Sequence, residues 1–166
     1  MRFPLFPVMM ADSLTDITPD ILKSRGIALL MMDFDNTIVP YTTNVPTPEM
    51  EQWLQTMQKS GIGLCVVSNS KRGRVVEFCR ARRIPCITHA KKPFRRGIAA
   101  CRDRFHLDLG HAALVGDQIY TDVLGANCAG AVSILVKAIH NHNIWLKLRH
   151  VLELPFIGIG RCRLRR

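Results

Sequence analysis

Five short apolar runs recur along the chain, and segments with a helical pattern separate most of them. The apolar runs span residues 27–33, 62–68, 84–88, 112–117 and 131–136, and the helical segments span 47–59, 72–82, 94–105 and 120–129. Continuous apolar runs of this length are typical of strands that are buried on both faces of a parallel sheet. Strands that alternate with helices favour right-handed crossovers, so the pattern predicts an α/β fold with three layers, a parallel sheet between two layers of helices.

Two helical segments carry more detailed predictions. Thr47 supplies a hydroxyl N-cap and Pro48 suits the first helical position, so a helix is expected from there to Lys59, ending before Gly61. The segment 72–82 is a basic helix in which Val75, Val76 and Cys79 are expected to face the sheet.

Length and composition limit the number of domains and the compartment. A chain of 166 residues with 48% hydrophobic residues is expected to form a single domain over 1–166. The longest apolar run, 27–32, is far too short to span a bilayer, and the proline-containing start is not expected to be a signal peptide. The six cysteines include no C-x-x-C pair, which disfavours zinc and favours reduced thiols in the cytoplasm. His140 and His142 are expected to lie in a surface loop.

The charge of the chain indicates what it binds. There are 23 Lys and Arg residues against 13 Asp and Glu residues, a formal net charge of +10. Such an excess favours nucleic acid, acidic lipid or a phosphorylated substrate, although a solvated basic surface would give the same composition. Aromatic residues make up only 7% and do not alternate with basic ones, which disfavours a non-catalytic nucleic-acid-binding module but leaves it as an alternative.

Polar residues gather where the predicted strands end. Asp33 and Asp35 follow the first strand, Ser68 and Asn69 end the second, and Asp117 ends the fourth. The carboxyl ends of parallel strands meet at one edge of the sheet, which is where such sheets bind ligands. Converging carboxylates need a counter-ion, and Mg²⁺ with oxygen ligands suits a site that binds phosphate. One carboxylate could act as a nucleophile and a second as a general acid and base, which are the parts of a metal-dependent phosphatase.

These motifs resemble those of the haloacid dehalogenase (HAD) superfamily. The run from Asp33 to Thr37 is similar to its D-x-D-x-T motif, and Ser68, Lys92 and the run from Gly116 to Asp122 match its later motifs in order. The surrounding residues, among them 16–19, 33–40, 90–93 and 116–125, are similar to those of the YqeG-type phosphatases of subfamily IIIA, a group related to phosphatidylglycerophosphate phosphatases. The resemblance covers residues 12–154 and implies a HAD-like Rossmannoid sheet.

The resemblance assigns roles to the acidic residues. Asp33 would be the nucleophile, forming an aspartyl-phosphate, and a Mg²⁺ ligand. Asp35 would be the general acid and base, with its backbone carbonyl also on the metal, and an acid at this position favours ester hydrolysis. Asp117 would complete the metal site, and Asp122 would support the loop and Lys92.

It also assigns the residues around the phosphate. Lys92 would neutralise the aspartyl-phosphate, with its neighbour Lys91 as the less favoured alternative. Thr37 would orient the motif loop, Ser68 would bind the phosphate, and Asn69 would support the leaving-group side.

The spacing of the motifs bears on the substrate. Neither the interval from Thr37 to Ser68 nor that from Ser68 to Lys92 can hold a cap domain, because independent domains need about 50 residues or more. An open site admits a phosphate displayed on a surface, and with the net charge this favours phosphatidylglycerophosphate or a similar anionic phospholipid. A soluble sugar or nucleotide phosphate is the alternative. The segment 144–152 is expected to be an amphipathic helix on the sheet, and the basic C-terminal tail, 155–166, is the segment expected to bind an anionic membrane from its inner face.

Overall fold

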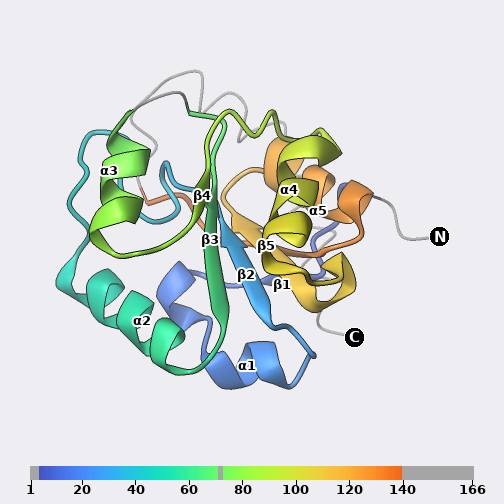
Figure 1. Ribbon diagram of the computed structural model, residues 1–166, viewed down its shortest axis with the longest axis horizontal. Coiled ribbons are helices and arrows are strands. Elements are labelled where there is room, and N and C mark those ends of the chain that lie inside the picture. The colour runs from blue at the N-terminus through green and yellow to red at the C-terminus, as the bar shows by residue number, and fades with distance from the viewer. Residues whose placement is uncertain (1–3, 71–72, 140–166) are drawn as a thin grey trace.

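The protein forms a six-stranded parallel sheet, seen in the computed structural model of Figure 1, which describes residues 4–70 and 73–139. The strand order is β1-β6-β5-β2-β3-β4, and each neighbouring pair runs parallel. The strands are β1 (Met9–Met10), β2 (Leu29–Met32), β3 (Gly63–Val67), β4 (Cys86–Ile87), β5 (Ala112–Gly116) and β6 (Val132–Leu135). The predicted parallel α/β fold is confirmed.

All five predicted strands are present, each somewhat shorter than its apolar run. The central strand β2 is buried at all four positions, as its unbroken apolar sequence predicts. The edge strand β1 was not predicted. It has only two residues, which is too short for a periodic pattern, and it exists because Met9 and Met10 pair with Ile134 and Leu135 at the end of β6.

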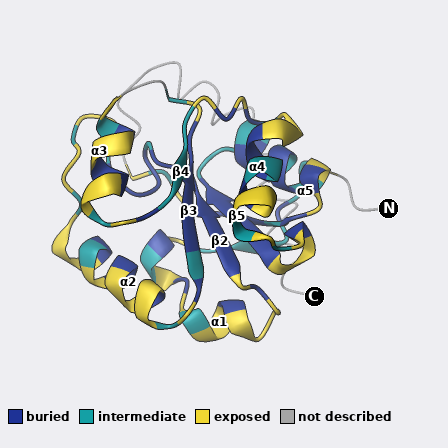
Figure 2. Cartoon of the chain, viewed as in Figure 1, coloured by how far each residue is buried: buried dark blue, intermediate teal, exposed yellow. Residues whose placement is uncertain are grey.

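Helices cover both faces of the sheet (Figure 1). On one face lie α1 (Pro19–Lys23), α2 (Pro48–Lys59) and α3 (Gly73–Ala81), and on the other α4 (Arg95–Phe105) and α5 (Leu124–Ala129). Successive side chains of β2 point to opposite faces of the sheet. Leu30 and Met32 therefore belong to the core under α2 and α3. Leu29 and Met31 belong to the core under α4 and α5. Buried residues accordingly line the strands and the inner sides of the helices (Figure 2).

The helix predictions are confirmed in their bounds and corrected in one detail. The Thr47 side chain accepts a hydrogen bond from the Met50 amide at 3.2 Å, and α2 ends at Lys59. In α3, Val75 and Cys79 are buried as expected, but Val76 is 37% exposed and Phe78 takes the inward position. The reason is the helical period: residues 75, 78 and 79 share one face, and residue 76 lies off it.

Short segments fill the two intervals in which related folds can carry a cap. Between Thr37 and Ser68 the structure describes a loop, α2 and β3, and between Ser68 and Lys92 it describes α3 and β4. After β5 the π-helical turn Ile119–Val123 leads directly into α5. The absence of a cap domain therefore holds for the described part of the chain.

Several predictions concern residues that the structure does not describe, namely the His140–His142 loop, the 144–152 helix and the 155–166 tail. Among the described residues, no helix combines the length and apolarity that a membrane span requires. Cys65 is fully buried, and its Sγ lies 3.4 Å from the Sγ of Cys101 without a covalent bond.

A close approach between α4 and the loop before it leads to a prediction about stability. A Cβ on Gly97 would lie 2.4 Å from the carbonyl oxygen of Ala90 and 2.6 Å from its Cα. Because both contacts are with backbone, Gly97→Ala is expected to lower the free energy of unfolding by about 2–3 kcal/mol in urea denaturation. Gly73→Ala, where nothing lies within 4 Å of the added Cβ, is the matched control and should cost nothing. Equal stabilities for the two variants would contradict the prediction.

Candidate active site

Most of the polar residues singled out at the strand ends line one pocket at the carboxyl edge of the sheet, and Asp117 lies close to one of them, Asp33, without lining the pocket. Asp33 follows β2, Ser68 follows β3, Lys92 lies in the loop after β4, and Asp117 follows β5. The pocket encloses about 270 Å³. It is lined by Asp33, Asp35, Asn36, Tyr41, Ser68, Asn69, Ser70, Lys92, Gln118 and Thr121.

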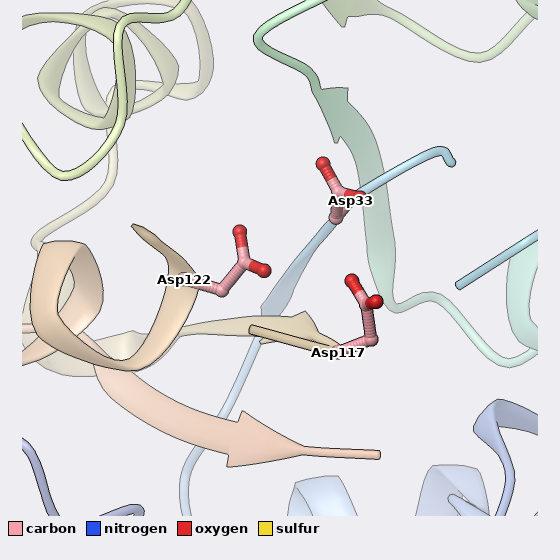
Figure 3. A group of neighbouring side chains, drawn as sticks. All are labelled: Asp33, Asp117 and Asp122. Atoms are coloured by element: carbon pink, nitrogen blue, oxygen red, sulfur yellow. The ribbon is translucent and has the colours of Figure 1, made fainter. Parts of the chain in front are cut away.

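Three carboxylates converge at the base of this edge. Asp33, Asp117 and Asp122 each offer an oxygen within 4.8 Å of the others. Figure 3 shows the three side chains, two of which come from strand ends and one from a helical turn. Asp33 and Asp122 are buried and Asp117 is half-buried. The sequence motifs gave Asp122 only a role in supporting the loop and Lys92. The structure places its carboxylate in the same cluster as Asp33 and Asp117.

The Lys92 ammonium lies between two of these carboxylates. Its Nζ is 2.6 Å from Asp33 Oδ1 and 2.6 Å from Asp122 Oδ1, and its side chain is almost fully buried. Burial alone would lower the pKa of Lys92, but the charges of Asp122 and Asp33 outweigh it, so the pKa is raised above the ordinary value for lysine. Lys92 is therefore positively charged at neutral pH.

Asp122 is held in place by its own loop. Its second oxygen, Oδ2, accepts a hydrogen bond from the Gln118 amide at 3.2 Å. Burial raises the pKa of Asp122 to about 6, and the charge of Lys92 opposes this rise. The approach depends on Gly116, because a Cβ there would lie 2.3 Å from the Asp122 carboxylate. The glycine before Asp117 therefore makes room for the third carboxylate.

Asn69 fixes the loop that carries Lys92. Its Nδ2 donates to the Lys92 carbonyl oxygen at 3.0 Å, and its Oδ1 accepts from the Lys92 amide at 2.7 Å. Asn69 thus lines the pocket while both polar atoms of its side chain bond to the backbone of Lys92. The neighbouring Lys91 is exposed, so of the two adjacent lysines it is Lys92 that the structure places among the carboxylates.

Ser68 and Thr37 differ in their access to the pocket. Ser68 lines it, and its Oγ accepts a hydrogen bond from the Ser70 amide at 3.0 Å. Thr37, grouped by the sequence motifs with the phosphate-site residues as the one that orients the motif loop, is buried and is not among the lining residues. Its turn folds back into the core between Phe34 and Val39.

Asp35 lines the pocket but stands apart from the carboxylate cluster. Its Oδ1 forms an ion pair with the guanidinium of Arg74 on α3. The sequence analysis assigned no role to Arg74, nor to the pocket residues Tyr41, Gln118 and Thr121, although the last two lie within the 116–122 motif. The only signal for Arg74 was its position in the basic stretch 71–83, where nothing distinguished it from the other arginines.

The donor set of the cluster fits a divalent cation. Three carboxylates carry three negative charges, and the one ammonium between them, Lys92, offsets only one. Oxygen ligands of this kind suit a hard ion such as Mg²⁺ better than a transition metal that prefers nitrogen or sulfur. The residues present therefore fit the metal that the sequence motifs imply.

Comparison with known proteins finds similar sequences. A family model described as HAD-hydrolase-like matches residues 89–141, the part of the chain that contains Lys92, Asp117 and Asp122. The chain is 36% identical over 120 residues to the "Probable phosphatase YqeG" of Bacillus subtilis, and the match covers 72% of this chain and 70% of that protein.

Solved structures share the fold at low sequence identity. A HAD-superfamily hydrolase from Ehrlichia chaffeensis has a TM-score of 0.53 and 14% identity, covering 79% of this chain and 98% of that one. The cobalt-bound deoxy-D-mannose-octulosonate 8-phosphate phosphatase YrbI from Haemophilus influenzae has a TM-score of 0.56 and 12% identity, covering 76% and 77%. At such identities the likeness extends to the fold alone.

Proposed function

Because this chain belongs to the YqeG family of HAD-type phosphatases, we propose that it hydrolyses phosphate monoesters with Mg²⁺ through a phosphorylated Asp33. The observation that carries the proposal is the cluster of Asp33, Lys92, Asp117 and Asp122, of which Asp33 and Lys92 also line the pocket. A nucleophilic carboxylate, a fixed cation and further metal ligands are the groups that phosphoryl transfer requires.

The reaction takes place in two steps on the residues of this chain. Asp33 attacks the phosphorus atom, the bond from phosphorus to the ester oxygen breaks, and Asp35 gives a proton to the departing oxygen. Water then attacks the phosphorus, the bond to Asp33 breaks, and Asp35 recovers a proton from the water. Asp35 lines the same pocket as Asp33, which is consistent with proton transfer at both steps.

The remaining residues bind and orient the phosphoryl group. The Lys92 ammonium, already 2.6 Å from Asp33 Oδ1, would offset the charge that builds up on the phosphoryl oxygens. Ser68 lines the pocket and would donate its hydroxyl hydrogen to one of those oxygens. Asn69 would act through the backbone of Lys92, since both polar atoms of its side chain bond there.

The metal would be held by Asp33 and Asp117, with the backbone carbonyl of Asp35 as a further ligand. When bound, Mg²⁺ supplies charge neutralisation that brings an anionic phosphate close to an anionic nucleophile. Asp122 would orient Lys92 and the 117–122 loop, through its contacts with Lys92 Nζ and the Gln118 amide.

The substrate that we propose is an anionic phospholipid that carries a phosphate monoester, such as phosphatidylglycerophosphate. The pocket has no cap in the described part of the chain, so it is open to a phosphate displayed on a surface. Phe94, two residues after Lys92, is 71% exposed, and Lys91, Arg95 and Arg96 beside it are exposed as well. An exposed aromatic ring among basic residues suits the surface of an anionic membrane. The basic 155–166 tail would add to this attraction, and the enzyme would act from the cytoplasm.

A substrate panel tests the proposed function. We expect the purified protein to release phosphate with Mg²⁺ and to lose this activity in EDTA. Values of kcat/KM should be highest for lipid phosphate monoesters in mixed micelles, compared with sugar phosphates, nucleotides and phosphopeptides. A soluble sugar or nucleotide phosphate as the best substrate would replace the lipid proposal and keep the phosphatase. Tight binding of nucleic acid without any hydrolysis would replace both.

A single substitution tests the membrane surface. Phe94→Ser removes the exposed ring, and serine at this N-cap position should preserve α4. We expect the variant to bind vesicles of phosphatidylglycerol several-fold more weakly, because it has no aromatic ring to transfer from water into the membrane surface. Its turnover of lipid should fall in proportion. Turnover of a small soluble ester should be unchanged. Ile21→Ser, an exposed apolar position on α1, is the control, and an equal loss in both variants would contradict the prediction.

A further inference from the structure

The guanidinium of Arg74 joins the Asp35 carboxylate to the loop that follows it. One nitrogen, Nη2, pairs with Asp35 Oδ1. The other, Nη1, donates to the carbonyl oxygens of Tyr41 and Thr43 at 3.1 and 2.9 Å and to Asn44 Oδ1 at 3.3 Å. One side chain from the first turn of α3 therefore fixes both a pocket carboxylate and the backbone of a pocket wall.

Aromatic rings hold this guanidinium in place. Its Cζ lies 5.2 Å from the ring centre of Phe34 and 5.4 Å from that of Tyr41, within the range of cation–π attraction. The side chains of Arg74 and Asp35 are only 11% and 17% exposed, so the pair is shielded from water and has little freedom to rearrange. Phe34 packs edge-on against Phe78 at 5.2 Å, which ties the arrangement to the core under α3.

A second arginine, near the other end of α3, offers a comparison. Arg82, just beyond the end of α3, pairs with Glu51 on α2, where Nη2 and Oε2 are 2.7 Å apart. It also stacks on Phe78, with Cζ 4.0 Å from the ring centre. Neither Arg82 nor Glu51 lines the pocket. Both arginines thus make a carboxylate pair and an aromatic contact, but only Arg74 holds a carboxylate of the pocket.

We propose that Arg74 is a positioning residue for Asp35, which fixes the carboxylate at the angle needed to take a proton from water when phosphorylated Asp33 is hydrolysed. The proposal rests on the proposed function. In that step water oxygen bonds to phosphorus, the bond from phosphorus to the Asp33 oxygen breaks, and one water proton moves to Asp35. A carboxylate without Arg74 would rotate away from the attacking water, and this step would slow most.

The test uses p-nitrophenyl phosphate, whose leaving group departs without a proton, so that only the second step needs Asp35. In Arg74→Gln we expect kcat to fall about 10- to 100-fold, part of what a general base contributes. The fraction of protein carrying phosphate, measured by intact mass after acid quench, should rise above that of the wild type. Asp35→Asn provides the reference for a missing base. Arg74→Lys should recover part of kcat, because it keeps the charge but loses the fork of donors.

The controls separate positioning from scaffolding and from failure of the proposed function. Arg82→Gln should leave kcat and the phosphorylated fraction unchanged. If Arg74→Gln and Arg74→Lys lose activity only in proportion to folded protein, with no rise in phosphoenzyme, Arg74 is part of the scaffold and the proposal is overturned. Normal kcat in Arg74→Gln overturns it as well. An inactive wild type that accepts no phosphate would instead count against the proposed function.

Discussion

Asp33→Asn is expected to abolish phosphatase turnover, by about 10³-fold or more, while the protein stays folded. The amide has nearly the same shape as the carboxylate but cannot attack phosphorus, so no phosphoenzyme can form. Its oxygen can still accept the hydrogen bond from Lys92, which also keeps its ion pair with Asp122. Mg²⁺ binding should therefore be weakened only modestly.

Steady-state kinetics with Mg²⁺ and intact mass after acid quench check this result. Thermal unfolding shows whether the variant is folded, and Asp103→Asn, an exposed position on α4, makes the same chemical change away from the pocket. A variant of Asp33 that kept a tenth of wild-type turnover would remove Asp33 from the nucleophile's role.

Lys92→Met is expected to cost both activity and stability. The substitution preserves the length of the side chain but leaves Asp33 and Asp122 facing one another without the ammonium between them. Removing one partner from a buried ion pair costs about 3–5 kcal/mol, and losing a cation at the phosphoryl group costs about 10²-fold or more in kcat. Lys91→Met changes an exposed neighbour in the same way and should leave stability and the turnover of a small soluble ester near wild type.

The loss of stability should depend on pH. The pKa of Asp122 is already raised to about 6 in the wild type, and Lys92 opposes that rise, so the variant's pKa lies higher still. The folded variant then holds a proton more tightly than the unfolded chain, and its stability increases as pH falls through that pKa. Urea denaturation in EDTA should therefore find the largest gap to wild type at pH 7.5 and a smaller one at pH 5. A gap independent of pH would contradict this account.

The sequence predicts those parts of the fold that depend on local pattern. The buried strand β2 follows from an unbroken apolar run, and α2 from Thr47, Pro48 and the period of its buried residues. The edge strand β1 depends on pairing with β6, far away in the chain, and two residues carry no period of their own. Its existence could only be learned from the folded structure.

The candidate site divides in the same way. The motif positions Asp33, Ser68, Lys92 and Asp117 lie at strand ends, and a parallel sheet brings such ends together whatever the side chains do. Arg74 was not predicted because its role depends on the direction of one long side chain relative to a loop about thirty residues earlier. The motif position of Thr37 likewise does not reveal that its side chain is buried in the folded protein.

The two hydrogen bonds between Asn69 and the backbone of Lys92 help to fix Lys92 when the protein folds, before any substrate binds. A free lysine side chain loses about 1.5–2 kcal/mol of rotamer entropy when it is fixed in one conformation. Here the backbone clamp and the two carboxylates restrict Lys92 as the protein folds. Each substrate molecule therefore meets an ammonium that is already immobile, and none of its binding energy is spent on ordering that side chain.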